Sequence, residues 1–226
     1  MTATGTGQPN TPRNDADKAA WRTRLLAARR AVPGAVRAAE AAALTEAVGR
    51  WAAGRPGTAC GYVPVGTEPG SVAMLDALRE AGWRVLLPVV PREKGSTGTV
   101  RPAALDWAEY HGSESLATGP FGLREPAGDR LGPEAVAQAD LVLVPALAVD
   151  RRGVRLGRGG GYYDRSLPLA SPDALLVAVV RDAELVDELP AEEHDVRMTA
   201  VLTPGRGLVS LPMDRGPGAA GRFHRA

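Results

Sequence analysis

Apolar residues recur at helical spacing near the start of the chain, and this pattern predicts its first elements. Trp21, Leu25 and Ala28 share one face of a helix that Asp15 or Asp17 can cap and that ends before Pro33-Gly34. Two further helices are predicted: an alanine-rich one over 35–53, and one that begins at Ser71 as its cap, runs to Glu80 and stops at Gly82.

Short continuous apolar runs predict the strands. The clearest is Asp140-Leu-Val-Leu-Val144, which is typical of a sheet covered on both faces. Pro88 places the end of a strand over 84–90 at an edge or a bend. Further strands are expected at 58–63, 98–104, 175–180 and 200–202, and a helix is expected to begin within 162–169. Strands that alternate with helices indicate an α/β sandwich with a largely parallel sheet.

Ligands of such sheets gather outside the carboxyl ends of the strands. Three segments follow predicted strand ends directly: Tyr62–Glu68, Pro145–Asp164 and Thr203. We therefore expect their side chains at one rim of the sheet.

Composition limits the classes of protein to consider. The chain has 226 residues, 44% of them hydrophobic, and a net charge of +1, which fits one globular domain and gives no support to charge-driven nucleic-acid binding. No apolar run suits a membrane span, and Met1 to Asp17 lacks the apolar core of a secretory signal. We expect a cytoplasmic monomer with no nucleic-acid or membrane partner.

The predicted parts of the chain are a disordered segment 1–14, a single domain over 15–211 and a loose tail 212–226. Cys60, the single cysteine, is expected to be a buried structural thiol.

The segment Arg155-Leu-Gly-Arg-Gly-Gly-Gly-Tyr-Tyr-Asp164 carries the strongest chemical signal. Its glycines let backbone N–H groups approach an anion closely, and its two arginines offer planar forks to phosphate or carboxylate oxygens. Asp164 is a hard oxygen ligand of the kind that Mg²⁺ takes beside phosphates. The run is neither a P-loop nor G-x-G-x-x-G. The alternative to a binding site is a mobile linker, but the paired tyrosines and the apolar run upstream argue against it.

A longer stretch around this run resembles the signature of the 5-formyltetrahydrofolate cyclo-ligases, the methenyltetrahydrofolate synthetases. It reads Pro145-Ala-Leu-Ala-Val-Asp150-Arg-Arg-Gly153-Val-Arg155-Leu-Gly-Arg-Gly-Gly-Gly-Tyr-Tyr-Asp-Arg165. The resemblance implies a three-layer α/β/α sandwich like that of the NagB/RpiA/CoA-transferase proteins. It also implies cyclisation of 5-formyltetrahydrofolate to 5,10-methenyltetrahydrofolate, with ATP as co-substrate, Mg²⁺ as cofactor, and ADP and phosphate as products. The formyl oxygen would attack the γ-phosphate, and N10 would close on the resulting iminium phosphate.

The resemblance also implies roles for residues outside the glycine run. Lys18 and Arg22 are one helical turn apart; a solvated basic face is the simpler interpretation of that pair, but the family's K-x-x-x-R contacts ATP phosphates. Glu68 would hold the pterin and Val63 would line its pocket, while Phe121, in the loop Thr118–Pro126, could stack on the folate. Arg24, Arg29 and Arg30 are expected to be surface charges.

The implied assignments are as follows. The catalytic residues would be Arg155, Arg158 and Tyr162. ATP would contact Lys18, Arg22, Arg155, Leu156, Gly157, Arg158, Gly159, Gly160, Gly161, Tyr162 and Tyr163. Folate would contact Val63, Glu68, Phe121, Arg158, Gly159, Gly160, Gly161 and Tyr162. Mg²⁺ would bind Asp164 and Asp195, with Asp150 and Asp182 as candidates for more distant supporting residues.

Two departures from the family pattern are modest. Some members carry lysine at the place of Gly160, which leaves more of the triphosphate to Arg158, and Val149 replaces a frequent phenylalanine. The acidic stretch that holds His194 is not read as a zinc site, because no second histidine or cysteine stands at ligand spacing.

Other functions remain open at this point. One is a paralogue that acts on another substrate, for example in thiamine-related metabolism, although Glu68 together with the complete glycine run argues against it. The other is a non-catalytic folate- or nucleotide-binding protein, or an arginine-rich RNA binder whose affinity would fall steeply with salt.

Overall fold

The computed structural model describes residues 11–91, 103–119, 122–192 and 195–212. Its helices are α1 (Thr11–Ala31), α2 (Gly34–Ala52), α3 (Ala73–Glu80) and α4 (Tyr162–Ser166), and four short 3-10 helices are η1 (Ser113–Ser115), η3 (Pro133–Gln138), η4 (Leu167–Leu169) and η5 (Asp182–Glu184). The strands are β1 (Thr58–Cys60), β2 (Arg84–Val89), β3 (Asp106–Glu109), β4 (Leu116–Thr118), β5 (Arg124–Pro126), β6 (Leu141–Pro145), β7 (Ala148–Asp150), β8 (Arg155–Leu156), β9 (Leu175–Val179), β10 (Leu185–Val186), β11 (Ala200–Thr203) and β12 (Gly207–Ser210).

The central sheet has the order β12-β11-β9-β6-β1-β2-β3. The five inner strands, β11 to β2, run parallel, whereas β12 and β3 pair antiparallel at the two edges. The predicted largely parallel sheet is confirmed. Pro88 lies beyond Leu86, the last residue of β2 that pairs with β1, so its missing N–H falls where β2 pairs with β3 alone.

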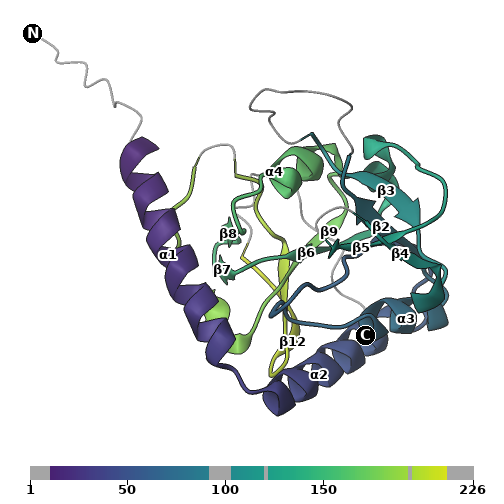
Figure 1. Ribbon diagram of the computed structural model, residues 1–226, viewed down its shortest axis with the longest axis horizontal. Helices are drawn as coiled ribbons and strands as arrows, with labels where there is room; N and C mark the ends of the chain where they lie inside the picture. The colour runs from purple at the N-terminus through teal and green to yellow at the C-terminus, as the bar shows by residue number, and fades with distance from the viewer. Residues whose placement is uncertain (1–10, 92–102, 120–121, 193–194, 213–226) are drawn as a thin grey trace, which may run out of the picture.

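The sheet is covered on both faces, which makes the fold a three-layer sandwich (Figure 1). In β6, Leu141 and Leu143 join the core beneath α2 and α3, while Val142 and Val144 join a second core that includes residues of η3 and η4. Alternate residues of β6 therefore enter different cores, and this accounts for its uninterrupted apolar run.

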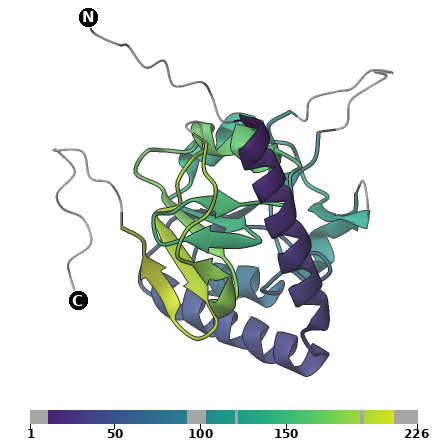
Figure 2. The same cartoon turned by 90° about the vertical axis from the view of Figure 1, so that its left-hand side faces the viewer.

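Helix α1 stands apart from these layers and covers a small sheet of order β10-β7-β8 (Figures 1 and 2). Leu25 of α1 packs there with Leu147, Val154 and Leu156. Because β8 leads directly into the glycine run, α1 and the small sheet together support that run.

Several expected boundaries shift. Helix α1 begins at Thr11, so residues 11–14 are helical rather than disordered, and residues 1–10 and 213–226 lie outside the described residues. Ser71 does not cap α3 with its side chain, since Val72 holds the N-cap position. Ala28 is exposed. The strand expected at 98–104 falls mostly outside the described residues, and the strand that follows it is β3.

Asp150 organises the turn between β7 and β8. Its buried carboxylate accepts hydrogen bonds from the N–H groups of Arg152 at 2.8 Å, Val154 at 2.9 Å and Leu189 at 3.2 Å. These bonds satisfy a charge that would otherwise be costly to bury. Asp150 therefore holds the backbone that carries the glycine run.

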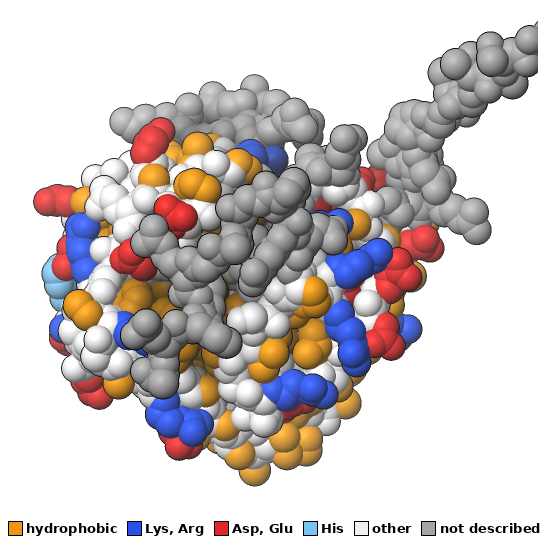
Figure 3. Space-filling model, turned by 180° about the vertical axis from the view of Figure 1, so that it is seen from behind, with side chains coloured by type: hydrophobic (Ala, Val, Ile, Leu, Met, Phe, Trp, Pro, Cys, Tyr) orange, Lys and Arg blue, Asp and Glu red, His pale blue; other side chains and the backbone are white. Residues whose placement is uncertain are grey.

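None of the helices within the described ranges is long and apolar enough to cross a membrane. On the face shown in Figure 3, acidic and basic side chains are interspersed, and no continuous basic surface is visible among the described residues there.

We predict that Gly153→Ala lowers the free energy of unfolding by about 2 kcal/mol or more, because left-handed backbone strain and steric overlap add. Gly153 has φ +86°, and a Cβ there would lie 2.3 Å from the Met198 carbonyl oxygen. Urea denaturation measures the loss. Gly128→Ala is the matched control, since a Cβ there meets nothing within 4 Å. Equal stability of the two variants would contradict the prediction.

The Cys60 thiol should react very slowly with thiol reagents in the folded protein. It is fully buried in β1, and burial raises its pKa from an ordinary 9.0 to about 12, against the opposing charge of Arg84. At pH 8 the reactive thiolate should be about a thousandfold scarcer than in the unfolded chain. Ellman's reagent should label Cys60 only after denaturant is added; rapid labelling of the native protein would show that β1 is accessible.

Candidate active site

A cavity of about 300 Å³ lies at the carboxyl ends of β1, β2 and β6. The segments that follow these strands line it, including Tyr62 and Glu68 after β1, Val90 after β2 and Ala146 after β6. The glycine run lines it as well, from Arg155 to Asp164 with Leu156 excepted. The structure thus brings two of the three expected segments to one cavity. Thr203 is not among the lining residues; its hydroxyl donates to Asp182 at 2.7 Å.

The glycine run begins with β8 and ends in the first turn of α4. Gly161, the N-cap residue of α4, has φ +69°, a left-handed conformation that glycine adopts without strain. Arg22 reaches the run from α1, and its Nε donates to the Gly157 carbonyl at 3.0 Å. Arg22 therefore ties α1 to the glycine run, although it does not line the cavity.

An ion pair joins the two loops across the cavity. The Arg158 Nε lies 3.1 Å from the Glu68 Oε1, and the Glu68 Oε2 accepts the Val65 N–H at 2.9 Å. Val63 lines the same cavity. Both predicted folate contacts of this loop thus lie beside the glycine run.

Arg155 pairs with Asp164 within the run, and its guanidinium carbon lies 5.9 Å from the centre of the Tyr163 ring. The Arg155 side chain is buried, whereas Asp164 is half exposed. Among the described residues, the Arg155 Nε and the Tyr163 hydroxyl have no hydrogen-bond partner. The cavity is therefore bordered by buried groups that can still donate a hydrogen bond to a ligand.

Both tyrosines of the run line the cavity, and Tyr163, like Tyr162, packs against the second core. Burial, reinforced by the negative charge of Glu68, raises the pKa of Tyr163 far above its ordinary value, so its hydroxyl stays protonated and can donate. Tyr162 lines the cavity and packs against the core under η4.

Lys18 lies elsewhere on α1 and is paired with two carboxylates. Its Nζ contacts Glu192 at 2.8 Å and Asp195 at 3.3 Å, and neither Lys18 nor Asp195 lines the cavity. Burial alone would lower the pKa of Lys18, but the hydrogen bonds and charges of the two carboxylates together raise it. Lys18 is thus a cation held by two carboxylates outside the cavity lining.

The predicted metal residues are a pair of carboxylates, Asp164 and Asp195. Within the described part of the chain, no group of three or more His, Cys, Asp or Glu side chains is placed to hold a metal ion. The Asp182 carboxylate accepts the Gly205 N–H at 2.8 Å together with the Thr203 hydroxyl, and its role as a supporting residue stays a prediction.

Comparison with known proteins decides the family. The family model described as "5-formyltetrahydrofolate cyclo-ligase family" matches residues 14–204. The chain belongs to this family. A 5-formyltetrahydrofolate cyclo-ligase of Mycolicibacterium smegmatis is 53% identical over 197 residues, which are 86% of this chain and 97% of the relative. The protein is accordingly an enzyme of the ligase class.

Solved structures agree on the cyclo-ligase fold. The NMR structure of Aquifex aeolicus 5,10-methenyltetrahydrofolate synthetase matches with a TM-score of 0.65 and 25% identity, and covers 92% of this chain and 99% of the other. A Mycoplasma pneumoniae 5,10-methenyltetrahydrofolate synthetase matches with a TM-score of 0.62 and 20% identity, over 82% of this chain and 97% of that one.

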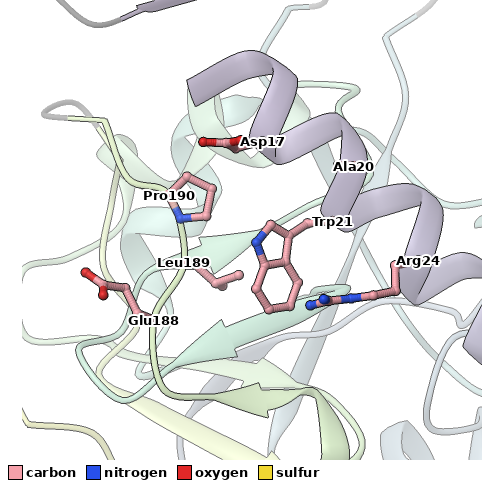
Figure 4. A pocket seen from close by; sticks show the side chains of 7 residues that line it. All are labelled: Asp17, Ala20, Trp21, Arg24, Glu188, Leu189 and Pro190. Carbon is pink, nitrogen blue, oxygen red and sulfur yellow. The ribbon is translucent and has the colours of Figure 1, made fainter. Parts of the chain in front are cut away.

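A second, more open hollow of about 570 Å³ lies on another face of α1 in this cyclo-ligase (Figure 4). Trp21 and Arg24 of α1 face Leu189 there, and the Arg24 guanidinium stacks 3.8 Å from the indole centre. None of the residues predicted for ATP, folate or metal lines it. The candidate active site is therefore the cavity at the strand ends.

Some lining residues of the cyclo-ligase cavity were not predicted. Arg29 was expected on the surface but is 1% exposed and lines the cavity, as do Glu125 and Leu105. The signal for Arg29 is its spacing: Lys18, Arg22, Leu25 and Arg29 stand at i, i+4, i+7 and i+11, one continuous face of α1. Leu105 carries no comparable signal. Phe121 lies outside the described residues, although its neighbours Leu123 and Arg124 line the cavity.

Proposed function

We propose that this cyclo-ligase converts 5-formyltetrahydrofolate to 5,10-methenyltetrahydrofolate at the strand-end cavity, with consumption of ATP in the presence of Mg²⁺. The observation that carries the proposal is that one cavity is bordered by both the arginine-bearing glycine run and the Glu68 loop, which Arg158 joins at 3.1 Å. One segment suits phosphates and the other suits a nitrogen-rich heterocycle.

The proposed chemistry needs no covalent nucleophile from the protein. The formyl oxygen attacks the γ-phosphorus, the bond from that phosphorus to the bridging oxygen breaks, and ADP leaves. N10 then attacks the activated carbon and loses its proton, and the carbon–oxygen bond breaks to release phosphate. Phosphoryl transfer of this kind depends on positioning and charge stabilisation.

The residues of the cavity fit those two tasks. Arg155 and Arg158 would neutralise charge on the transferring phosphoryl group, and the backbone N–H groups of Gly159 to Gly161 would contact phosphate oxygens. Tyr162 would hold the folate near the reacting carbon. Lys18 and Arg22 would act at the outer part of the triphosphate, since Arg22 already contacts the run at Gly157.

Mg²⁺ fits Asp164, one of the carboxylates that line the cavity. It is usually bound by one or two carboxylates together with substrate phosphates and waters, so it needs no cluster of three acidic side chains. The half-exposed Asp164 lines the cavity and would hold it. Asp195, which is bonded to Lys18 and to the Glu192 N–H, would contribute beside it or orient Lys18. Bound Mg²⁺ would neutralise charge on the phosphates.

The remaining expectations stay predictions: a monomer located in the cytoplasm, with no nucleic-acid or membrane partner.

The purified protein should produce the methenyl product from 5-formyltetrahydrofolate only when ATP and Mg²⁺ are both present. The appearance of the methenyl absorbance measures turnover, and chelation of Mg²⁺ should stop it. Reactions without each component are the controls. Absence of product at saturating substrate, ATP and Mg²⁺ would overturn the proposed function.

Arg158→Ala should lower kcat by about a hundredfold or more, by analogy with removal of one donor that stabilises a charged transition state. The fold should survive, because the Arg158 side chain is half exposed. Steady-state turnover and thermal melting test both parts. Arg50→Ala is the control: it removes an exposed arginine paired with Glu46 on α2, away from the cavity lining. Near-normal turnover of the Arg158 variant would exclude the assigned role.

A further inference from the structure

Arg29 is held rigidly at the wall of the cavity. Its Nε and Nη2 each donate to a different oxygen of Glu184 at 2.7 Å, and Nη2 also donates to the Ala146 carbonyl at 2.6 Å. The side chain is 1% exposed and that of Glu184 is 6% exposed. This planar, two-point pairing fixes the guanidinium in one orientation.

One nitrogen of Arg29 is left over. The Nη1 atom is buried and has no hydrogen-bond partner among the described residues. Arg29 and Ala146 line the cavity, whereas Glu184 does not. Because Glu184 occupies the Nε and Nη2 edge of the guanidinium, Nη1 is the donor that remains for a ligand. A buried donor without a partner costs stability, which a ligand acceptor would recover.

The surroundings indicate what kind of acceptor would fit. The positive charge of Arg29 is already balanced by Glu184, which disfavours a second anion as its ligand. The rest of this cavity is rich in apolar side chains, which suit a heterocycle better than a triphosphate: Val63, Val65, Pro88, Val90 and Leu105. Arg155 and Arg158, at the glycine run, remain available for phosphates.

We propose that Arg29 is a further substrate-binding residue, whose Nη1 donates a hydrogen bond to a carbonyl oxygen of the folate. This inference rests on the proposed function and extends it. Because Glu184 holds the guanidinium in place, little side-chain entropy is lost when the ligand binds. Three neutral oxygens share this chemistry: the carbonyl of the pterin ring, the amide carbonyl of the aminobenzoyl group and the formyl oxygen.

Arg29→Lys tests the proposal, because lysine keeps a positive charge for Glu184 but has no planar second edge to present to the cavity. Calorimetry without ATP should show the Kd for 5-formyltetrahydrofolate rising about tenfold or more, the loss expected for a hydrogen bond from a charged donor. The Kd for MgATP should not change. Arg84→Lys is the control: the Arg84 Nε makes a 2.8 Å ion pair with Glu109, outside the cavity lining, and both Kd values should stay at wild type.

Tetrahydrofolate, which has the ring and amide carbonyls but no formyl group, separates the formyl oxygen from the other acceptors. An equal loss for both folates assigns Nη1 to a carbonyl that the two share, and a loss confined to 5-formyltetrahydrofolate assigns it to the formyl oxygen. If Arg29→Lys does not fold, the double variant Arg29→Gln, Glu184→Gln replaces the ion pair with a neutral one and should show the same loss.

Two results would overturn the proposal. Unchanged folate Kd values in a folded variant would make Arg29 a purely structural residue, and so would a parallel loss for MgATP. Failure of the proposed function looks different, because the wild-type protein itself would then neither bind nor convert 5-formyltetrahydrofolate.

Discussion

Burial of the parallel strands on both faces is the constraint on which the rest of this molecule depends. Their side chains fill two cores, one beneath α2 and α3 and the other under the short helices on the opposite face. Neither face is left for a ligand, so recognition falls to the segments that leave the carboxyl ends. Strands β1, β2 and β6 end beside one another, and their outgoing chains meet around a single cavity. Loops that are far apart in sequence can therefore serve one reaction.

The glycine run depends on a second, smaller arrangement. It leaves β8, whose hairpin with β7 is tied together by the buried carboxylate of Asp150 and covered by α1. Arg22 then bonds from α1 to the run itself. A glycine-rich segment pays a large entropic cost to become ordered, and rigid support on both sides reduces the freedom that remains to be lost when a ligand binds. In this way packing far from the cavity would contribute to the geometry of the proposed phosphate contacts.

The features that sequence predicted well are those in which local pattern and tertiary burial agree. The apolar run of β6 and the helix end before Pro33-Gly34 are of this kind, and the glycine run predicted the cavity because its residue types carry chemistry wherever they lie. The edge strands β3 and β12 were not predicted, because their sequences have neither a long apolar run nor strict alternation of apolar and polar residues. Arg29 was misassigned for a different reason: a lone arginine on a helix is usually solvated. Its burial is possible because Glu184, which is 155 residues away in sequence, lies next to it in the fold and pairs with it. Local patterns contain no information about such a distant partner.

The ion pairs around the cavity differ in burial, and this difference separates fixed groups from exchangeable ones. Both members of the Arg29–Glu184 pair are buried, and removing one partner of such a pair typically costs about 3–5 kcal/mol, so Arg29 must keep its position. The Arg158 guanidinium is half exposed, and pairs of that kind contribute about 0–1 kcal/mol. Arg158 can therefore exchange Glu68 for a phosphate at little cost, and Asp164, also half exposed, can likewise accept a new partner. The proposed reaction would need both kinds of group: rigid ones where the neutral heterocycle is held, and exchangeable ones where charge moves between oxygens as the phosphoryl group is transferred.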